Sequence, residues 1–264
     1  MFMDNNIEYI YHYTTLEKAI KFILPEMQLR LGIYKNTNDP RENKEFFFKL
    51  VSENGATFPN NNEELSKLVS KEIVDGVKLL SFSTPNANNH GFDYTSMWAH
   101  YGDKHNGVCL QIDKKEFEKE NPEIFKGLGF NEVNYVEPYS DYEYNKKLEQ
   151  IDYDKILSIG IKQYVRQNLR FEKLKYLYFT KYKDWEYERE IRLLVFSDVQ
   201  TDEYCKINNS LRKVYLGEEV NKNYLPSLLH LLPDEILLQP VACRLGRMIT
   251  NKDLFNEIHL LKQK

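Results

Sequence analysis

The sequence predicts an α+β fold, a single domain of mixed, mostly antiparallel sheets flanked by helices. The chain has 264 residues, 42% of them hydrophobic, which is enough for one large core. Strand and helix signals do not alternate regularly, so a doubly wound parallel sheet is disfavoured. No internal repeat, low-complexity tract or Pro/Gly-rich linker divides the chain. Residues 1–264 are therefore expected to form one domain.

The first third of the chain mixes short strands and helices. Residues 8–13 are rich in β-forming side chains, and Thr14 or Thr15 can cap a helix that ends before Pro25. Residues 36–40 form a strong turn signal. In order, the sequence predicts strands over 8–13, 29–33 and 77–83, helices over 15–24, 41–51 and 64–75, and loops over 52–62 and 85–90.

The remaining two thirds begin with a short helix over 96–101 and a strand over 107–112, followed by a polar segment with helical pieces over 114–149. A long helix is expected over 155–175, where Lys162, Arg166 and Arg170 recur at steps of four. Further strands are expected over 176–180, 191–196 and 213–216, and a helix over 224–232 is bounded by Pro233. A strand and then a helix are expected in the last 25 residues.

The composition restricts the class of protein. A net charge of -4 argues against a protein that coats nucleic acid non-specifically. Three well-separated cysteines without a CxxC pair favour a reducing compartment, with neither a disulfide framework nor a zinc knuckle. The N-terminus lacks the basic and apolar regions of a signal peptide, and no apolar stretch is long enough to cross a membrane. We expect a soluble cytoplasmic protein.

Residues 185–192 carry the strongest candidate for a functional site. Glu186, Glu188 and Glu190 alternate in this segment, and the apolar run 193–196 follows. If the segment is extended, the three carboxylates share one face and repel one another, which raises at least one pKa. Such a face fits either a solvated edge strand or a site where a cation binds or a positive transition state forms.

Other candidate residues lie at strand ends and on one short helix. His12 sits within the first strand, and Ser81 and Ser83 share one face at the end of the 77–83 strand. Each also has a purely structural explanation, as a packed histidine or as hydroxyls that satisfy a turn. Trp98 and Tyr101 are three residues apart, so they share a helix face that forms either core or a stacking wall for a planar ring.

A basic segment offers a second kind of surface. Lys162, Arg166 and Arg170 are spaced four apart, and Lys173 and Lys175 follow; between 162 and 183 seven basic residues face one acidic residue. This stripe fits either a solvated helix face or a contact surface for phosphates or RNA. The spacing of the histidines and Asp103 near residue 100 matches no metal motif, so no metal site is expected. The chain also has no dinucleotide-binding, P-loop or nucleophile-elbow motif.

Five short motifs in order resemble the bacterial family catalogued as domain of unknown function 2971. The resemblance covers residues 9–217 and leaves 218–264 as a C-terminal strand and helix extension. Its motifs are Tyr11-His12-Tyr13-Thr14, Asn38-Asp39-Pro40, Leu80-Ser81-Phe82-Ser83, Trp98-x-x-Tyr101 with Gly107-Val108, and Trp185-x-Tyr187-Glu188-x-Glu190-x-Arg192.

The same order of motifs is more distantly similar to the ADP-ribosyltransferase fold. That resemblance implies NAD as substrate, no metal, and a macromolecular acceptor such as RNA, DNA or protein, in a toxin or phage-defence setting. It implies Glu190, Glu188 and His12 as catalytic residues, with Glu190 stabilising the cationic transition state. It further implies NAD contacts by His12, Tyr13, Thr14, Ser81, Ser83, Trp98, Tyr101 and Arg192.

Several departures from that fold keep other functions open. The chain lacks a clear second-motif tyrosine and a first-strand arginine, and its middle motif is Ser-Phe-Ser-Thr rather than Ser-Thr-Ser. A non-catalytic nucleotide- or nucleic-acid-binding module, or a hydrolase acting on nucleotides, keeps much of the same pattern. Because functional carboxylate clusters are often strained, Glu190→Gln is expected to leave thermal stability within roughly 1 kcal/mol of wild type or to raise it.

Overall fold

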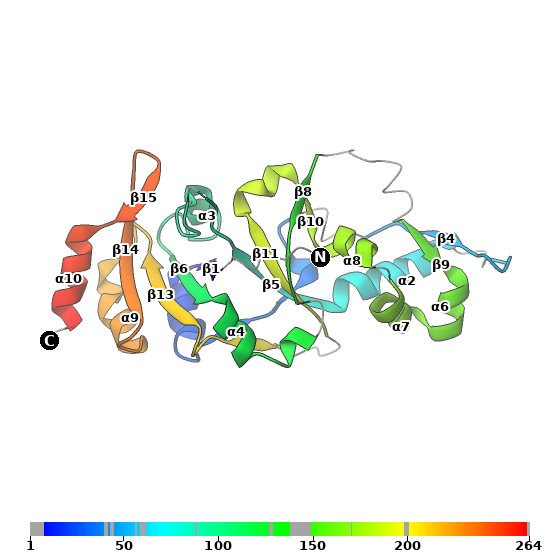
Figure 1. The fold of residues 1–264 in the computed structure, drawn as a ribbon, viewed down its shortest axis with the longest axis horizontal. Helices are drawn as coiled ribbons and strands as arrows, with labels where there is room; N and C mark the ends of the chain where they lie inside the picture. The colour runs from blue at the N-terminus through cyan, green and yellow to red at the C-terminus, as the bar shows by residue number, and fades with distance from the viewer. Residues whose placement is uncertain are drawn as a thin grey trace.

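A computed structural model shows how the strands assemble. It describes residues 8–39, 42, 45–55, 57–58, 62–87, 89–126, 129–137, 149–169, 171–197 and 201–262. Within these residues a nine-stranded sheet runs along the molecule, in the order β15-β14-β13-β6-β1-β5-β11-β7, with β3 also paired to β5 (Figure 1). The strands are β15 (Arg247–Thr250), β14 (Leu237–Arg244), β13 (Leu211–Leu216), β6 (Val108–Asp113), β1 (Tyr9–Thr14), β5 (Val77–Ser83), β11 (Glu190–Phe196), β7 (Gly129–Glu132) and β3 (Gly32–Ile33).

Most strand pairs are antiparallel, as the sequence predicts. Within the large sheet β13 and β14 run parallel. Three two-stranded sheets are also present in the described residues: β10 (Thr180–Tyr182) with β8 (Asn134–Val136), β12 (Tyr204–Lys206) with β2 (Gln28–Arg30), and β4 (Lys49–Val51) with β9 (Gln150–Asp152). The prediction of mixed sheets flanked by helices is thus confirmed.

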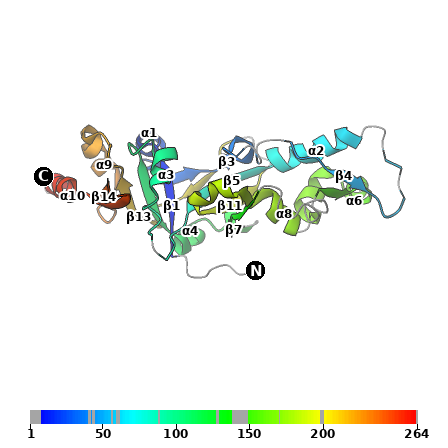
Figure 2. The same ribbon diagram turned by 90° about the horizontal axis from the view of Figure 1, so that it is seen from above.

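The helices gather at the two ends of an elongated molecule (Figures 1 and 2). The N- and C-terminal helices α1 (Leu16–Lys18), α9 (Leu225–Leu231) and α10 (Lys252–Lys262) flank one end of the sheet, and α4 (Lys114–Glu120) follows β6. At the other end lie α2 (Asn62–Asp75), α6 (Tyr153–Ile159), α7 (Ile161–Gln163) and α8 (Phe171–Tyr178). The short helix α3 (Thr95–His100) lies above the centre of the sheet in Figure 1.

The alternation of side chains gives the sheet two different faces. On one face Ile10, Phe82 and Ile191 join a single large apolar cluster. On the other face two smaller clusters are separated along the strands. Tyr11 and Tyr13 belong to one of them, and Leu79 and Leu194 belong to the other. Because side chains two apart share a face, the polar residues between these clusters on β5 and β11 point to the same side.

Most of the expected elements are confirmed. The strands expected over 8–13, 77–83, 107–112, 191–196 and 213–216 are β1, β5, β6, β11 and β13, and the helices over 64–75 and 96–101 are α2 and α3. Thr15 caps α1, its hydroxyl accepting the Lys18 N–H at 3.2 Å. The C-terminal segment forms a strand hairpin, β14 and β15, before the expected helix.

The helix expected over 41–51 is wrong in its described part. Residues 45–48 have no regular structure and 49–51 form β4. The N–H groups of Phe46 and Phe48 donate to the hydroxyls of Ser70 and Ser66 on α2, each at 2.8 Å. An extended chain turns Phe46 and Phe48 toward the apolar cluster, whereas Phe47 is 77% exposed.

The long helix expected over 155–175 is broken. Gly160 has φ 81° and separates α6 from α7, which continues as a π-helical turn, Tyr164–Asn168. Leu169 is extended, and α8 starts at Phe171. The strand expected over 176–180 is also wrong, because α8 continues to Tyr178 and β10 begins at Thr180. Among the described residues, no helix is both long and apolar enough to cross a membrane.

Candidate functional site

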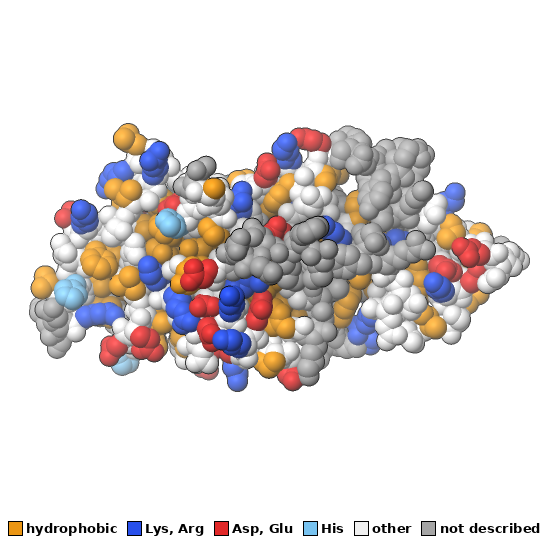
Figure 3. Space-filling model, viewed as in Figure 1, with side chains coloured by type: hydrophobic (Ala, Val, Ile, Leu, Met, Phe, Trp, Pro, Cys, Tyr) orange, Lys and Arg blue, Asp and Glu red, His pale blue; other side chains and the backbone are white. Residues whose placement is uncertain are grey.

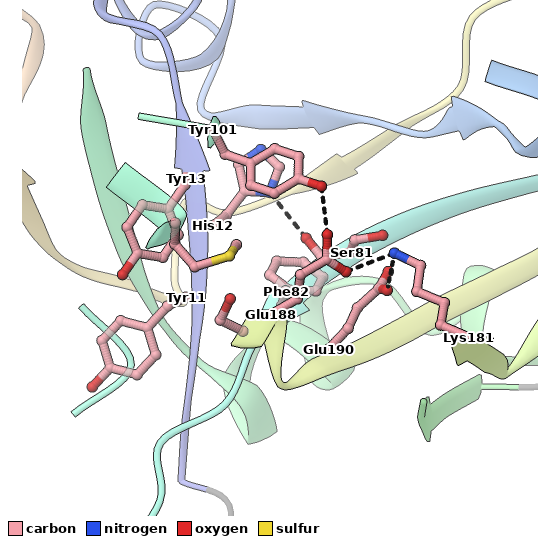
Figure 4. Close-up of a pocket in the computed structure, with 11 residues that line it drawn as sticks. Tyr11, His12, Tyr13, Ser81, Phe82, Tyr101, Lys181, Glu188 and Glu190 are labelled. Atoms are coloured by element: carbon pink, nitrogen blue, oxygen red, sulfur yellow. Dashed lines mark hydrogen bonds and ion pairs between the residues drawn. The ribbon is translucent and has the colours of Figure 1, made fainter. Parts of the chain in front are cut away.

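A pocket of about 130 Å³ lies on the sheet face where β1, β5 and β11 adjoin, between the two smaller apolar clusters (Figure 4). Its residues come from these strands, from α3 and the turn that follows it, and from β10 and the 3-10 helix Lys183–Glu188. They are Tyr11, His12, Tyr13, Ser81, Phe82, Ser83, Met97, Tyr101, Lys181, Glu188 and Glu190.

Strand register brings distant residues together. Ser83 on β5 is paired with Tyr11 on β1 and with Glu190 on β11. Three residues from separate parts of the chain therefore lie side by side on one face of the sheet. The Ser83 side chain is buried, and its Oγ has no hydrogen-bond partner within the described part of the chain. It is a hydroxyl available to a ligand.

The side chain of His12 on β1 bonds a backbone carbonyl of β5 that pairs with neither β1 nor β3. β1 pairs with β5 at Ser83, β3 pairs with the same edge at Leu79, and the carbonyl of Ser81 lies between them. His12 Nδ1 lies 3.2 Å from that carbonyl oxygen, so Nδ1 carries the proton and donates to it. Burial lowers the pKa of His12, although the Ser81 carbonyl acts in the opposite direction. The ring is thus neutral near pH 7, and Nε2 can accept a hydrogen bond.

Glu188 and Glu190 are joined by a lysine that the sequence analysis assigned to the basic segment. Lys181 Nζ lies 2.6 Å from Glu188 Oε2 and 2.9 Å from Glu190 Oε2 (Figure 4). All three side chains are buried. No motif spacing marks Lys181 in the sequence, because its role arises only when β10 is placed beside the end of β11. The cation allows two carboxylates to share one buried site.

Arg192 lies behind the pocket rather than in its wall. Its Nε and Nη2 donate to the two oxygens of Glu190 at 2.7 and 2.9 Å. Its Nη1 donates to the Tyr178 carbonyl at 2.6 Å and to the buried carboxylate of Glu42. Arg192 is fully buried, so it orients Glu190 but is not placed to contact a ligand. Glu42 is a member of this cluster that sequence reasoning missed.

The buried charge cluster contains three carboxylates, Glu42, Glu188 and Glu190, and two cations, Lys181 and Arg192. If all five were ionised, one negative charge would be in excess. Burial raises the pKa of Glu188 and of Glu42 despite the neighbouring cations. Burial also opposes ionisation of Glu190, but the charges of Arg192 and Lys181 outweigh it, so the pKa of this carboxyl is lowered. Glu190 is therefore the carboxyl whose ionised form the cluster favours most, whereas ionisation of Glu188 and Glu42 is opposed by their burial.

Tyr101 closes one side of the pocket. Its hydroxyl donates to Glu188 Oε1 at 2.5 Å and lies 3.4 Å from Asn38 Nδ2. The rings of His100 and Tyr187 lie 5.6 Å apart. These contacts tie α3 to the 3-10 helix that carries Glu188, so Tyr101 is placed both to hold Glu188 and to face a ligand.

The condition under which Glu186, Glu188 and Glu190 would share one extended face is not met. Residues 183–188 form a 3-10 helix, Arg189 adopts a left-handed conformation with φ 45°, and only Glu190 begins the strand. Glu186 is exposed. Glu188 and Glu190 nevertheless both line the pocket, where Lys181 lies within ion-pair distance of each.

Trp98, Thr14 and Tyr13, which the resemblance assigns to NAD contacts, are placed differently by the structure. Trp98 is fully buried, donates its Nε1 hydrogen to the Phe92 carbonyl and packs edge-on against Tyr13, so it supports the pocket wall without lining it. Thr14 is buried at the end of β1, outside the pocket. Tyr13 does line the pocket, but its hydroxyl donates to the Gly91 carbonyl at 2.7 Å. Tyr13 therefore offers a ring face rather than a hydroxyl.

The basic stripe does not form a single helix face. Lys162 lies on α7 and Arg166 on the π-helical turn, where it pairs with Glu72 at 3.1 Å. Lys173 is buried and donates to the Gln150 carbonyl, Lys175 is exposed on α8, and Arg170 lies outside the described residues.

On the face shown in Figure 3, acidic and basic side chains are interspersed over α4, where Lys119 pairs with Glu116.

Within the described part of the chain, no group of three or more His, Cys, Asp or Glu side chains is arranged to hold a metal ion. The carboxylate oxygens of Glu188 accept hydrogen bonds from Lys181 and Tyr101. Those of Glu190 accept from Arg192.

Comparison with known proteins bears on family membership. No curated protein and no solved structure matches the chain significantly. One family model matches the central part of the chain, which includes most of α3, all of β6, Lys181 and both pocket glutamates, whereas His12 and Ser81 lie outside the match. Residues 97–193 match the family described as "Protein of unknown function (DUF2971)", which supports the resemblance to that family.

Proposed function

We propose that the protein is an ADP-ribosyltransferase-like enzyme, which cleaves the nicotinamide–ribose bond of NAD and transfers ADP-ribose to a macromolecular acceptor. One observation carries this proposal. His12, the serines of β5 and the Glu188–Glu190 pair come from three distant segments of the chain and line one pocket. The ADP-ribosyltransferase resemblance assigns these same three segments to NAD binding and catalysis.

The pocket suits a single planar ring with a carboxamide group. Its volume, about 130 Å³, is of the same order as the cavity of about 150 Å³ that binds benzene, so about one ring of a ligand can enter it. Tyr11, Tyr13 and Tyr101 supply aromatic surface around it. His12 Nε2 can accept from the carboxamide N–H, and Ser83 Oγ can donate to its oxygen. A nicotinamide ring would thus find both stacking surface and hydrogen-bond partners.

The charge of the pocket suits the reaction. Breaking the C1′–N bond leaves its electron pair on nicotinamide and positive charge on the ribose, which a nearby carboxylate stabilises. The acceptor then forms a bond to C1′ and releases a proton, which a carboxylate can take. Glu190 contacts two cations and Glu188 contacts one. We therefore assign the transition-state role to Glu188 and an anchoring role to Glu190.

The test is nicotinamide release from NAD by the wild-type protein, with RNA, DNA or cell lysate as acceptor source. Glu188→Gln removes the charge at nearly constant shape, and we expect it to reduce release by at least about a hundredfold. Glu186→Gln is the matched control, because Glu186 is exposed on the same 3-10 helix. It should release nicotinamide at the wild-type rate.

Three outcomes would reject the proposal. The first is a folded wild-type protein that releases no nicotinamide under any of these conditions; if NAD then binds equally to wild type and Glu188→Gln, a nucleotide-binding module is the better description. The second is nicotinamide release that survives in Glu188→Gln. The third is release that a chelator abolishes, which would indicate a metal-dependent hydrolase.

A further inference from the structure

A second, larger pocket adjoins the first. Its volume is about 370 Å³, and it shares His12 and Ser81 with the smaller pocket. The imidazole of His12 lies between β1 and β3, so it forms a boundary between the two spaces. The other residues of the second pocket are Arg30, Leu31, Gly32, Ile33, Asn36, Thr37, Leu79, Leu80 and Asp202.

We propose that this second pocket binds the adenosine diphosphate half of the dinucleotide, an inference that rests on the proposed function. The smaller pocket admits about one ring, so most of a dinucleotide must lie elsewhere. The larger pocket begins at the residues where the smaller one ends. A ligand with its nicotinamide beside Ser83 can therefore pass His12 and continue toward Arg30.

The lining of the second pocket fits an adenine nucleotide. Leu31 and Leu79 are buried and Ile33 is 45% exposed, which gives apolar surface for a purine ring and a rim open to solvent. Asn36 adds an amide that can hydrogen-bond a ribose hydroxyl. Arg30 supplies a guanidinium at the rim, which is the preferred partner of phosphate oxygens.

The arginine is held only loosely by its neighbour. Arg30 Nη1 lies 3.4 Å from Asp202 Oδ1, and the two side chains are 62% and 56% exposed. An exposed pair of this kind is worth at most about 1 kcal/mol, so a phosphate can displace the carboxylate. Asp202 then competes with the ligand for Arg30. Removing Arg30 should weaken binding, whereas neutralising Asp202 should strengthen it.

Gly32 allows the second pocket to be filled selectively. It lines the larger pocket and not the smaller one. A Cβ at this position would meet only the Leu79 carbonyl oxygen, at 3.7 Å, and its backbone is not left-handed. A leucine at position 32 is therefore compatible with the strand and takes up space in the second pocket.

The experiment measures binding of ADP-ribose and of nicotinamide, each separately, to four folded proteins: wild type, Gly32→Leu, Arg30→Ala and Asp202→Asn. We expect Gly32→Leu and Arg30→Ala each to weaken ADP-ribose binding by at least about tenfold. Asp202→Asn should tighten it by up to about fivefold. Nicotinamide binding should be equal in all four, and melting temperatures verify folding.

The proposal is overturned if wild type does not bind ADP-ribose, or if the two Arg30–Asp202 variants leave its affinity unchanged. This outcome is separable from failure of the proposed function. If wild type releases nicotinamide from NAD with a KM that Gly32→Leu and Arg30→Ala do not alter, the reaction stands and the second-pocket assignment is wrong. If ADP-ribose binds as expected but no nicotinamide is ever released, the pocket assignment stands and the enzymatic proposal is wrong.

Discussion

Glu190 is held on both carboxylate oxygens by the buried guanidinium of Arg192, at 2.7 and 2.9 Å. Glu190→Gln would leave that buried cation partly uncompensated, and breaking a buried ion pair typically costs about 3–5 kcal/mol. We expect this loss in chemical denaturation. Glu186→Gln, which alters an exposed side chain, should change stability by no more than about 0.5 kcal/mol. A near-neutral Glu190→Gln would support the strained carboxylate that the sequence alone favours.

Glu188 should impose a pH dependence on stability. Its folded pKa is raised above the ordinary value of 4.5 by burial. The stability contributed by the neutral carboxyl is therefore present below that value and is lost as the pH rises through the folded pKa. Glu188→Gln cannot ionise, so its unfolding free energy should rise relative to wild type as the pH increases from the ordinary carboxyl pKa of 4.5 through the raised folded pKa of Glu188. A difference that stays flat over this interval, as expected for Glu186→Gln, would contradict the raised pKa.

At the scale of elements, the strands that carry the site could be predicted and the segments between them could not. β1, β5 and β11 have runs of β-forming and apolar side chains, and alternation correctly placed Ser81 and Ser83 on one face. The turn before β11 was missed because Arg189 is left-handed, with φ 45°. Only glycine, and to a lesser extent asparagine or aspartate, signals that conformation in a sequence.

The partners of the buried charges, which lie far apart along the chain, could not be predicted from the sequence either. Lys181 and Glu42 join the charge cluster only through tertiary packing, and nothing in local spacing reveals which charges will be buried together. The prediction of one basic helix face over residues 162–175 was wrong for a similar reason. A stripe at steps of four requires an unbroken helix, whereas Gly160 and the extended Leu169 interrupt the chain.

At the scale of the whole molecule, residues 218–262 form part of the fold that holds the site. β14 pairs with β13, and Val241 and Met248 pack in the same cluster as Tyr11 and Tyr13 of the pocket wall. A chain truncated after Gly217 would expose the edge of β13 and this apolar cluster. We expect it to be insoluble or to lose cooperative thermal unfolding. If it instead melts as sharply as the full chain and binds nicotinamide, the 9–217 segment is an independent core.

His12 links ligand binding to the packing of the strands, because the same ring holds β1 to β5 and lines the pockets. One ring nitrogen holds the Ser81 carbonyl, and the other is free to meet a ligand. A ligand that binds this imidazole therefore also acts on the edge of β5, and the ring lines both pockets. A ligand in either pocket would make this strand edge more rigid. Binding of one half of a dinucleotide would therefore pre-order the pocket that receives the other half.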